Sequence, residues 1–243
     1  MIRALLSTIS FVVATILGSL AAVTAGVVDK SGDTVLALAR LWSRVILGVP
    51  GVKLEVTMRA ELDPTRPYVF MPNHASMVDI WAVFVAIPAS FRFIAKKQLS
   101  RIPLFGWAMA AGRFIFIDRQ NALSARRSMD EAARRIRSGQ SVVFFPEGTR
   151  TRSGRLGAFK KGGFHLAIDS GAAIVPVAIR GSGAAMPPGS PLIRAGSVKI
   201  EVDAPIPTEG LTNADRDALI VKVRSRIAGM LGEPAEGAAS ADQ

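Results

Sequence analysis

The chain has 243 residues, of which 49% are hydrophobic and 20% are charged, a composition too apolar for a disordered protein and too charged for a polytopic membrane protein. It contains no cysteine, which excludes a disulfide scaffold, a cysteine-ligated metal and a thiol nucleophile, and its two histidines, His74 and His165, are the only candidates for imidazole catalysis. The formal net charge of +11 resides in residues 92–161, where 16 basic residues accompany 4 acidic ones, as expected for a surface that meets phosphate groups.

The amino-terminal segment is unusually apolar. Residues 4–28 carry no charge, and as a helix they would extend about 37 Å, longer than the roughly 30 Å of a bilayer's hydrocarbon core. A secretory signal is the competing interpretation, because a basic residue precedes the run and residues 23–25 resemble a cleavage site. Residues 33–47 place apolar side chains at three- and four-residue spacing, which is typical of an interfacial helix or of a core-packing one. After the apolar run we favour the interfacial helix, and we expect residues 1–50 to form membrane-anchoring helices.

The rest of the chain alternates strand-like and helix-like segments. Runs rich in β-branched and aromatic residues occur at 54–58, 68–71, 91–95, 114–117, 141–145, 174–179 and 198–202, and helix-like stretches occur at 77–87, 122–138 and 160–170, with a last helix introduced at residue 211. This alternation predicts a single α/β domain over residues 51–231, with a largely buried central sheet flanked by helices. Residues 232–243 have no apolar periodicity, and we expect a disordered tail.

A first candidate site follows the strand at 68–71, where Asn73 and His74 precede an apolar helix that contains Asp79. On one continuous helix, residues five apart point about 140° away from each other, so His74 can meet Asp79 only from a loop. Ser76 would then be the helix N-cap, with Asp79 in the first turn. A carboxylate on one ring nitrogen makes the other a better base near neutral pH, able to take a proton from an alcohol. The alternative is a capping box beside an incidental histidine.

A second candidate site follows the strand at 141–145. Pro146 and Gly148 end that strand, and Arg150 begins a series of cations suited to binding a phosphate by charge-assisted hydrogen bonds. Glu147 either pairs with Arg150 and orients it or contacts a substrate. A plain basic turn is the alternative. A third segment, residues 112–119, has cations at both ends of a strand and by itself indicates little.

These motifs together resemble those of the glycerolipid acyltransferase family, and most closely those of its bacterial 1-acyl-sn-glycerol-3-phosphate acyltransferases. Four blocks occur in the family's order over about 105 residues. They are Asn73, His74 and Asp79; Gly112, Phe116, Ile117 and Arg119; Phe145, Pro146, Glu147, Gly148, Thr149 and Arg150; and Ile174, Val175, Pro176 and Val177. The segments that begin at Lys96 and Phe159 also look like the family's.

The resemblance implies a role for each matching residue. It implies that His74 is a general base, that Asp79 orients it, and that the base activates the sn-2 hydroxyl of lysophosphatidic acid for attack on the thioester of acyl-CoA or acyl-carrier protein. It further implies that the acceptor's phosphate is bound by the side chains of Arg119 and Arg150, with Lys97 assisting, in a pocket shaped by Glu147, Gly148 and Thr149. Asn73, Gly112, Pro146 and Pro176 support the blocks. The product would be phosphatidic acid, and neither a metal nor a cofactor is implied.

The expected surroundings follow from these roles. The lipid substrates reside in bilayers, so we expect an enzyme on an anionic membrane surface, at the cytoplasmic face of a bacterial inner membrane, where thioester donors are made. An excess of arginine over lysine, 22 to 8, is a weak hint of a GC-rich bacterial source. Nucleic acid is not an expected partner.

Three alternatives remain at this stage. The same chemistry could serve another acceptor, such as a lyso-ornithine lipid or another lysophospholipid. A non-enzymatic binder of anionic membranes or nucleic acid would use the basic segment alone and would not need His74. A secreted protein would be processed after Ala25.

Overall fold

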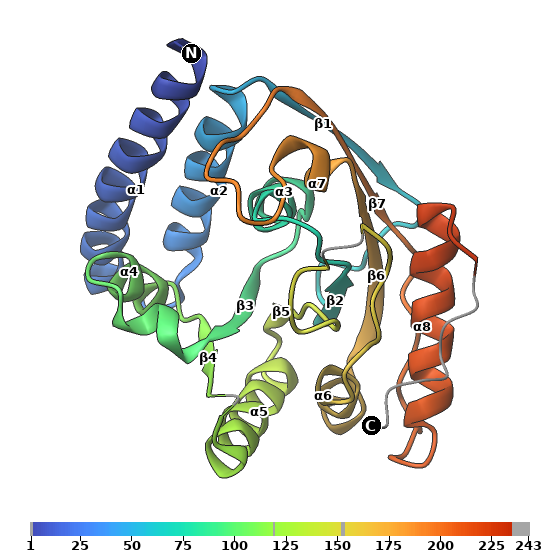
Figure 1. Cartoon of the computed structure of the whole chain (residues 1–243). Helices are drawn as coiled ribbons and strands as arrows, with labels where there is room; N and C mark the ends of the chain where they lie inside the picture. Colours follow the sequence, from blue (N-terminus) through green and yellow to red (C-terminus); the bar gives the residue numbers. More distant parts are fainter. Residues whose placement is uncertain (1, 119, 152–153, 235–243) are drawn as a thin grey trace.

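The computed structural model describes residues 2–118, 120–151 and 154–234, and in this part of the chain seven strands form one sheet (Figure 1). The spatial order is β1-β7-β6-β2-β5-β3-β4. The strands are β1 (Val52–Met58), β2 (Tyr68–Pro72), β3 (Phe91–Lys96), β4 (Ile115–Ile117), β5 (Ser141–Val143), β6 (Ala173–Arg180) and β7 (Gly196–Val202). Each strand overlaps a predicted run, and the predicted α/β fold with a buried central sheet is confirmed.

The direction of the strands decides where polar groups gather. Strands β6, β2, β5, β3 and β4 are mutually parallel, whereas β7 runs antiparallel to β6 and parallel to β1. The carboxyl ends of the five parallel strands therefore share one edge of the sheet, which is the usual place for a ligand site in an open α/β fold. We refer to it as the carboxyl edge.

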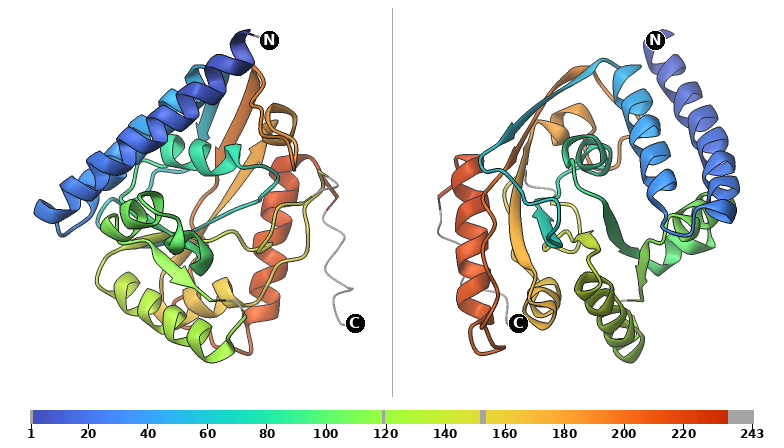
Figure 2. Two further views of the ribbon diagram at one scale, coloured as in Figure 1. Left: turned by 60° about the vertical axis from the view of Figure 1, so that its left-hand side comes forward. Right: turned by 180° about the vertical axis from the view of Figure 1, so that it is seen from behind.

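Alternate residues of the strands enter two hydrophobic cores, because successive side chains of a strand point to opposite faces. Phe70 lies in one core with the helices α2 (Asp33–Gly48) and α3 (Val78–Ala86). Val69 and Met71 lie in the other, with α5 (Ala122–Arg137), α6 (Gly162–Ser170) and α8 (Arg216–Leu231). The views in Figure 2 show these two helical layers on opposite sides of the sheet.

The first helix, α1 (Ile2–Val28), lies outside α2 and also packs on the short helix α4 (Phe105–Ala111). Its segment Ser7–Val28 has a mean hydropathy of 2.2, and by length and composition it could cross a membrane. Only 11% of it is buried, so it is not the core helix of a soluble domain, although a signal sequence passes the same test.

The turn between α1 and α2 is tied to the sheet by Arg92 of β3. The side chain of this arginine is almost fully buried, and its guanidinium donates to the Asp33 carboxylate (2.9 Å) and to the carbonyl oxygen of Ser31 (2.7 Å). The predicted interfacial helix α2 buries Leu36 in the core, and Leu41 is 57% exposed. Core packing, the second interpretation of its spacing, therefore accounts for part of its apolar face.

Several details differ from the sequence-based expectations. The helices α4 and α7 (Ser182–Ala185) and the 3-10 helix η1 (Lys97–Arg101) were not predicted. The last helix begins at Arg216 rather than at residue 211, because the Asp215 carboxylate accepts hydrogen bonds from the N–H and hydroxyl of Thr212 in a preceding turn. The predicted tail begins too early, since Glu233 accepts a hydrogen bond from the N–H of Leu156. Residues 235–243 lie outside the described residues.

Candidate functional site

His74 lies in the loop that leaves the carboxyl end of β2, and Asp79 lies in the first turn of α3. Their side chains meet, with His74 Nδ1 2.9 Å from Asp79 Oδ2. The Asp79 side chain is fully buried, whereas the His74 side chain keeps 13% of its surface exposed. Since the carboxylate occupies Nδ1, Nε2 is the ring nitrogen left for a substrate. The juxtaposition required of a histidine–carboxylate pair is therefore present.

Backbone N–H groups of the loop that carries His74 also bond to the Asp79 side chain. Asp79 Oδ2 also accepts hydrogen bonds from the N–H groups of Ala75 (2.7 Å) and Ser76 (2.8 Å), so one oxygen collects three donors. The other oxygen, Oδ1, is buried without a hydrogen-bond partner among the described residues. The predicted capping-box contact and the histidine–carboxylate contact thus coexist.

Ser76 does not occupy the predicted N-cap position, since α3 begins at Val78 after Met77. Its hydroxyl accepts from the N–H of Val78 (3.2 Å) and donates to the carbonyl oxygen of Met186 (2.7 Å). The hydroxyl therefore ties the loop to the segment that follows α7.

Asn73 fixes the other end of the loop. Its amide Nδ2 donates to the carbonyl oxygen of Ile179 (3.1 Å), and its Oδ1 accepts from the N–H of Ile179 (2.7 Å). The side chain continues the ladder between β2 and β6, the strand in which Pro176 pairs with Met71. A buried asparagine with both polar atoms paired to backbone has a structural reason to be there.

Glu147 is buried behind the His74 loop rather than exposed beside Arg150. Its Oε1 accepts the backbone N–H of His74 (2.6 Å), and its Oε2 accepts the N–H of Gly157 (2.8 Å). Of the two interpretations of Glu147, the ion pair with Arg150 does not form: both carboxylate oxygens accept from backbone N–H groups, and no ion pair joins the two described side chains. Burial raises the pKa of Glu147 above its usual value, and the two backbone hydrogen bonds oppose that rise.

The segment after β5 also contacts His74 through a ring and a backbone group. Phe145 stacks on the imidazole, with ring centroids 4.0 Å apart and an angle of 21° between the planes. The N–H of Thr151 donates to the carbonyl oxygen of His74 (2.8 Å). Between these contacts, Gly148 adopts a left-handed conformation (φ 72°) and turns the chain. The Phe145 and Thr151 contacts were not predicted, because they join residues more than 70 positions apart.

Of the predicted phosphate-binding residues, Lys97, Thr149 and Arg150 follow strands at the carboxyl edge. Thr149 and Arg150 are exposed after β5. Lys97, in η1 after β3, is exposed and forms an ion pair with Asp118 after β4 (3.3 Å). Arg119 lies outside the described residues.

Gly112 is not part of this edge. It lies before β4, and a Cβ added to it would come within 2.9 Å of Val35 in α2. Its place in the second block is therefore explained by close packing between the helices. No group of three or more His, Asp or Glu side chains that could hold a metal ion occurs within residues 2–118, 120–151 and 154–234.

Comparisons with known proteins show which family the chain is related to. The model of a family described as Acyltransferase matches residues 53–180. A chloroplastic 1-acyl-sn-glycerol-3-phosphate acyltransferase of Arabidopsis thaliana is 34% identical over 79% of this chain and 52% of its own length. The human 1-acyl-sn-glycerol-3-phosphate acyltransferase beta is 35% identical over 70% of this chain and 62% of its own length. The chain thus spans only about half to three fifths of these relatives.

A solved structure supports the fold over the whole chain. The crystal structure of the 1-acyl-sn-glycerophosphate acyltransferase of Thermotoga maritima superposes with a TM-score of 0.81 at 24% identity and covers 100% of this chain and 99% of its own. The family model spans more than half of the chain and includes the loops that follow β2, β3, β4 and β5. The chain belongs to the acyltransferase family.

Proposed function

We propose that this protein transfers an acyl group from the thioester of acyl-CoA or acyl-carrier protein to the sn-2 hydroxyl of 1-acylglycerol-3-phosphate, giving phosphatidic acid. The observation that carries the proposal is the contact between His74 Nδ1 and the buried Asp79 carboxylate at the carboxyl edge. The acceptor is inferred from the relatives, which are named 1-acyl-sn-glycerol-3-phosphate acyltransferases.

The chemistry follows from the two ring nitrogens. Asp79 holds the proton on Nδ1, so Nε2 accepts the proton of the acceptor hydroxyl as its oxygen attacks the thioester carbonyl. The tetrahedral intermediate then collapses, the carbon–sulfur bond breaks, and the thiolate leaves with the proton returned by the imidazolium. One ester and one thiol are formed, and the acyl group never resides on the protein. The buried carboxylate stabilises the imidazolium while it exists.

The acceptor's phosphate is assigned to the cations of the carboxyl edge. Arg150 is exposed on the segment whose Thr151 N–H is bonded to His74, and Lys97 emerges from the neighbouring strand. Guanidinium groups bind phosphate through paired, charge-assisted hydrogen bonds. Arg119 is included because it matches the family's second block, and Gly148 and Thr149 shape the turn that presents Arg150.

The membrane contact is assigned to α1. Its apolar residues are largely exposed, among them Leu17 (61%) and Val13 (48%), and transferring such surface from water into lipid is favourable. We place the protein on the cytoplasmic face of a bacterial inner membrane, where its lipid substrates and thioester donors meet.

The test is an assay of donor and acceptor pairs with the full chain and two histidine variants. We expect H74A to lower transfer at least 10³-fold. H165A is the matched control, because His165 lies away from the site and bonds to Asn213 and Arg216, and it should keep wild-type activity. A fully active H74A variant refutes the assigned base. Transfer to a lyso-ornithine lipid, but not to 1-acylglycerol-3-phosphate, would replace the proposed acceptor.

A further inference from the structure

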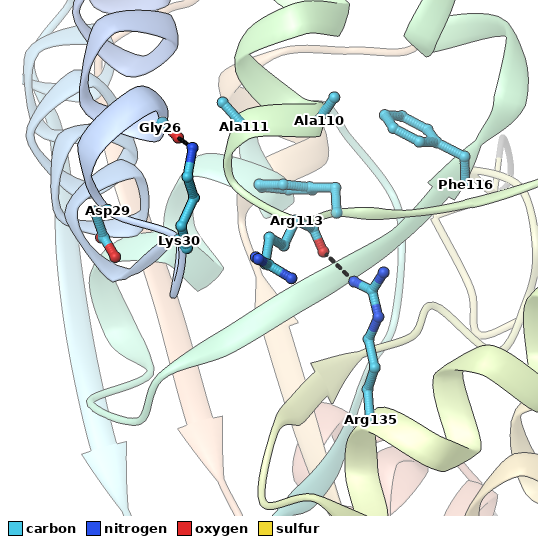
Figure 3. A pocket seen from close by; sticks show the side chains of 9 residues that line it. Gly26, Asp29, Lys30, Ala110, Ala111, Arg113, Phe116 and Arg135 are labelled. Carbon is cyan, nitrogen blue, oxygen red and sulfur yellow. Dashed lines mark hydrogen bonds between the residues drawn. The ribbon is translucent and has the colours of Figure 1, made fainter.

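A basic pocket lies at the opposite end of β4 from the carboxyl edge (Figure 3). Its volume is about 340 Å³, and it opens where the end of α1 meets the end of α4. Three cationic side chains line it: Lys30 after α1, Arg113 after α4 and Arg135 from α5. Arg113 lies before β4, at the amino end of the strand. Asp118 lies at the carboxyl end of β4, where it pairs with Lys97, so this pocket is separate from the proposed acceptor site.

Arg113 occupies a backbone position that favours glycine. Helix α4 ends in a Schellman turn, in which the N–H of Arg113 bonds to the carbonyl oxygen of Ala110 (2.9 Å) and that of Phe114 to Met109 (3.0 Å). The residue after the C-cap of such a turn is left-handed, and Arg113 has a φ of 57°. A non-glycine residue held there is strained, and strain of this kind clusters at functional positions. In this conformation the Arg113 side chain lines the pocket.

The cations of the pocket outnumber the available anions. The Arg113 guanidinium is exposed and has no hydrogen bond or ion pair with any residue that the structure describes. Among the described residues, Lys30 Nζ donates only to the carbonyl oxygen of Gly26 (3.2 Å) at the end of α1. Arg135 donates to the carbonyl oxygen of Arg113 (2.9 Å) and shares Glu131 with a neighbouring arginine. An anion with several oxygens would satisfy these donors.

The one acid among the lining residues offsets only one of the three positive charges. The Asp29 carboxylate accepts hydrogen bonds from Ser31 and from the N–H of Thr34 (2.7 Å), which cap the turn after α1. These hydrogen bonds lower the pKa of Asp29 far below its usual value, so the carboxylate is ionised at neutral pH. Both of its oxygens accept hydrogen bonds within its own turn. The pocket is left with an excess of positive charge.

Exposed apolar side chains lie close in sequence to residues that line the pocket. Val27 and Val28 at the end of α1 are 68% and 86% exposed, and Trp107 is 57% exposed. Trp107 lies one turn before Ala110 and Ala111, which line the pocket, so it is on the same face of α4. Exposed aliphatic and tryptophan side chains beside clustered cations are typical of the level of lipid head groups. We propose that this pocket binds the phosphate of an anionic membrane lipid and so fixes how the protein sits on the bilayer.

Binding is measured by titration calorimetry on the full chain in non-ionic detergent micelles. The probes are short-chain phosphatidylglycerol, short-chain phosphatidylcholine and inorganic phosphate. We expect phosphatidylglycerol to bind the wild-type protein about tenfold more tightly than either other probe. Equal binding of inorganic phosphate would overturn the lipid assignment, since the exposed apolar side chains near the pocket would then contribute nothing. Equal binding of phosphatidylcholine would show that the cations do not select an anion.

The variant R113G removes the cation and supplies the residue that the turn favours, so its fold should be kept. We expect it to weaken phosphatidylglycerol binding about tenfold, the loss typical of a charge-assisted contact. R113K should keep most of the affinity. R127A, which removes an exposed arginine from α5 outside the pocket, is the matched control and should change it less than twofold. Equal losses in R113G and R127A would show a diffuse charge effect and overturn the proposal, as would wild-type binding by R113G.

The proposal does not depend on acyl transfer. R113G should keep wild-type transfer to a water-soluble short-chain acceptor, whereas R150A should keep wild-type binding of phosphatidylglycerol. If R150A abolishes lipid binding and R113G does not, the anion is held at the carboxyl edge, and the pocket has no such role.

Discussion

The substitution D79N separates the charge of the carboxylate from its hydrogen bonds. Asp79 Oδ2 accepts from His74 Nδ1 and from the N–H groups of Ala75 and Ser76, while Oδ1 is buried and unpaired among the described residues. An asparagine can place its oxygen where Oδ2 lies and its NH₂ group where Oδ1 lies. The three donors then keep their acceptor, and the imidazole keeps its proton on Nδ1, while the negative charge is lost.

The magnitude follows from the 2.9 Å contact. At an effective dielectric constant of about 20, a full charge pair at this distance gains about 6 kcal/mol, which is an upper limit for the stabilisation of the imidazolium. The amide dipole keeps part of this energy. We therefore expect kcat/KM to fall about 10²- to 10³-fold, equivalent to roughly 3–4 kcal/mol. The free energy of unfolding should change by less than about 1 kcal/mol, since no hydrogen bond is broken.

The assay measures acyl transfer from one thioester to one lysolipid over a range of pH, together with unfolding by denaturant. D79A is the comparison, because it leaves His74 and the N–H groups of Ala75 and Ser76 without their acceptor and should lower the free energy of unfolding by about 2–5 kcal/mol. A D79N protein within threefold of wild-type activity would show that the charge of Asp79 takes no part in the reaction. A D79N protein as unstable as D79A would show that the amide does not adopt the expected orientation.

Three further predictions test the surroundings of His74. Burial raises the pKa of Glu147, so the native protein holds the proton of its carboxyl group more tightly than the unfolded chain does. The free energy of unfolding of the wild type, relative to that of E147Q, should therefore fall as pH rises from about 4 through the raised pKa. Denaturant unfolding at several pH values measures it, and parallel curves would contradict it. N73A leaves the N–H and C=O of Ile179 unpaired and should lower the free energy of unfolding by about 2–4 kcal/mol, whereas N213A at an exposed hydrogen bond should cost less than about 1 kcal/mol. R150A should lower kcat/KM for a phosphate-bearing acceptor at least tenfold and leave transfer to 1-acylglycerol nearly unchanged. Equal losses on the two acceptors would contradict the assigned contact between Arg150 and the phosphate.

The sequence predicts most of the sheet because each strand is a short run of β-branched or aromatic residues whose alternate side chains fill the two cores. It does not predict α4, which has only seven residues and forms where α1 can cover it. Gly106 shows why, since a Cβ there would come within 2.4 Å of the Ser100 carbonyl oxygen. Such a close approach depends on the folded chain, and the local sequence pattern carries no sign of it.

The candidate site shows the same limit. The proximity of His74 and Asp79 can be argued from five residues of local chain, because a loop followed by one helical turn brings them together. The position of Glu147 cannot, since its contact with the His74 N–H spans 73 residues and requires that β2 and β5 be neighbours in the sheet. In the sequence, an acid three residues before a cation in a basic segment was compatible with an ion pair or with a substrate contact, and only the strand order shows that the acid turns inward.

The buried position of Glu147 shows what the third block, residues 145–150, does in the structure. Both peptide groups of His74 are bonded to the segment that follows β5, its N–H to Glu147 (2.6 Å) and its carbonyl oxygen to the N–H of Thr151 (2.8 Å). Phe145 adds a ring stacked on the imidazole. Arg150 lies within this same short segment, so the backbone that carries the proposed phosphate ligand is fastened on both sides to the backbone that carries the proposed base. A displacement of one must displace the other, so in the proposed reaction the acceptor's phosphate and its hydroxyl would stay in register with Arg150 and His74.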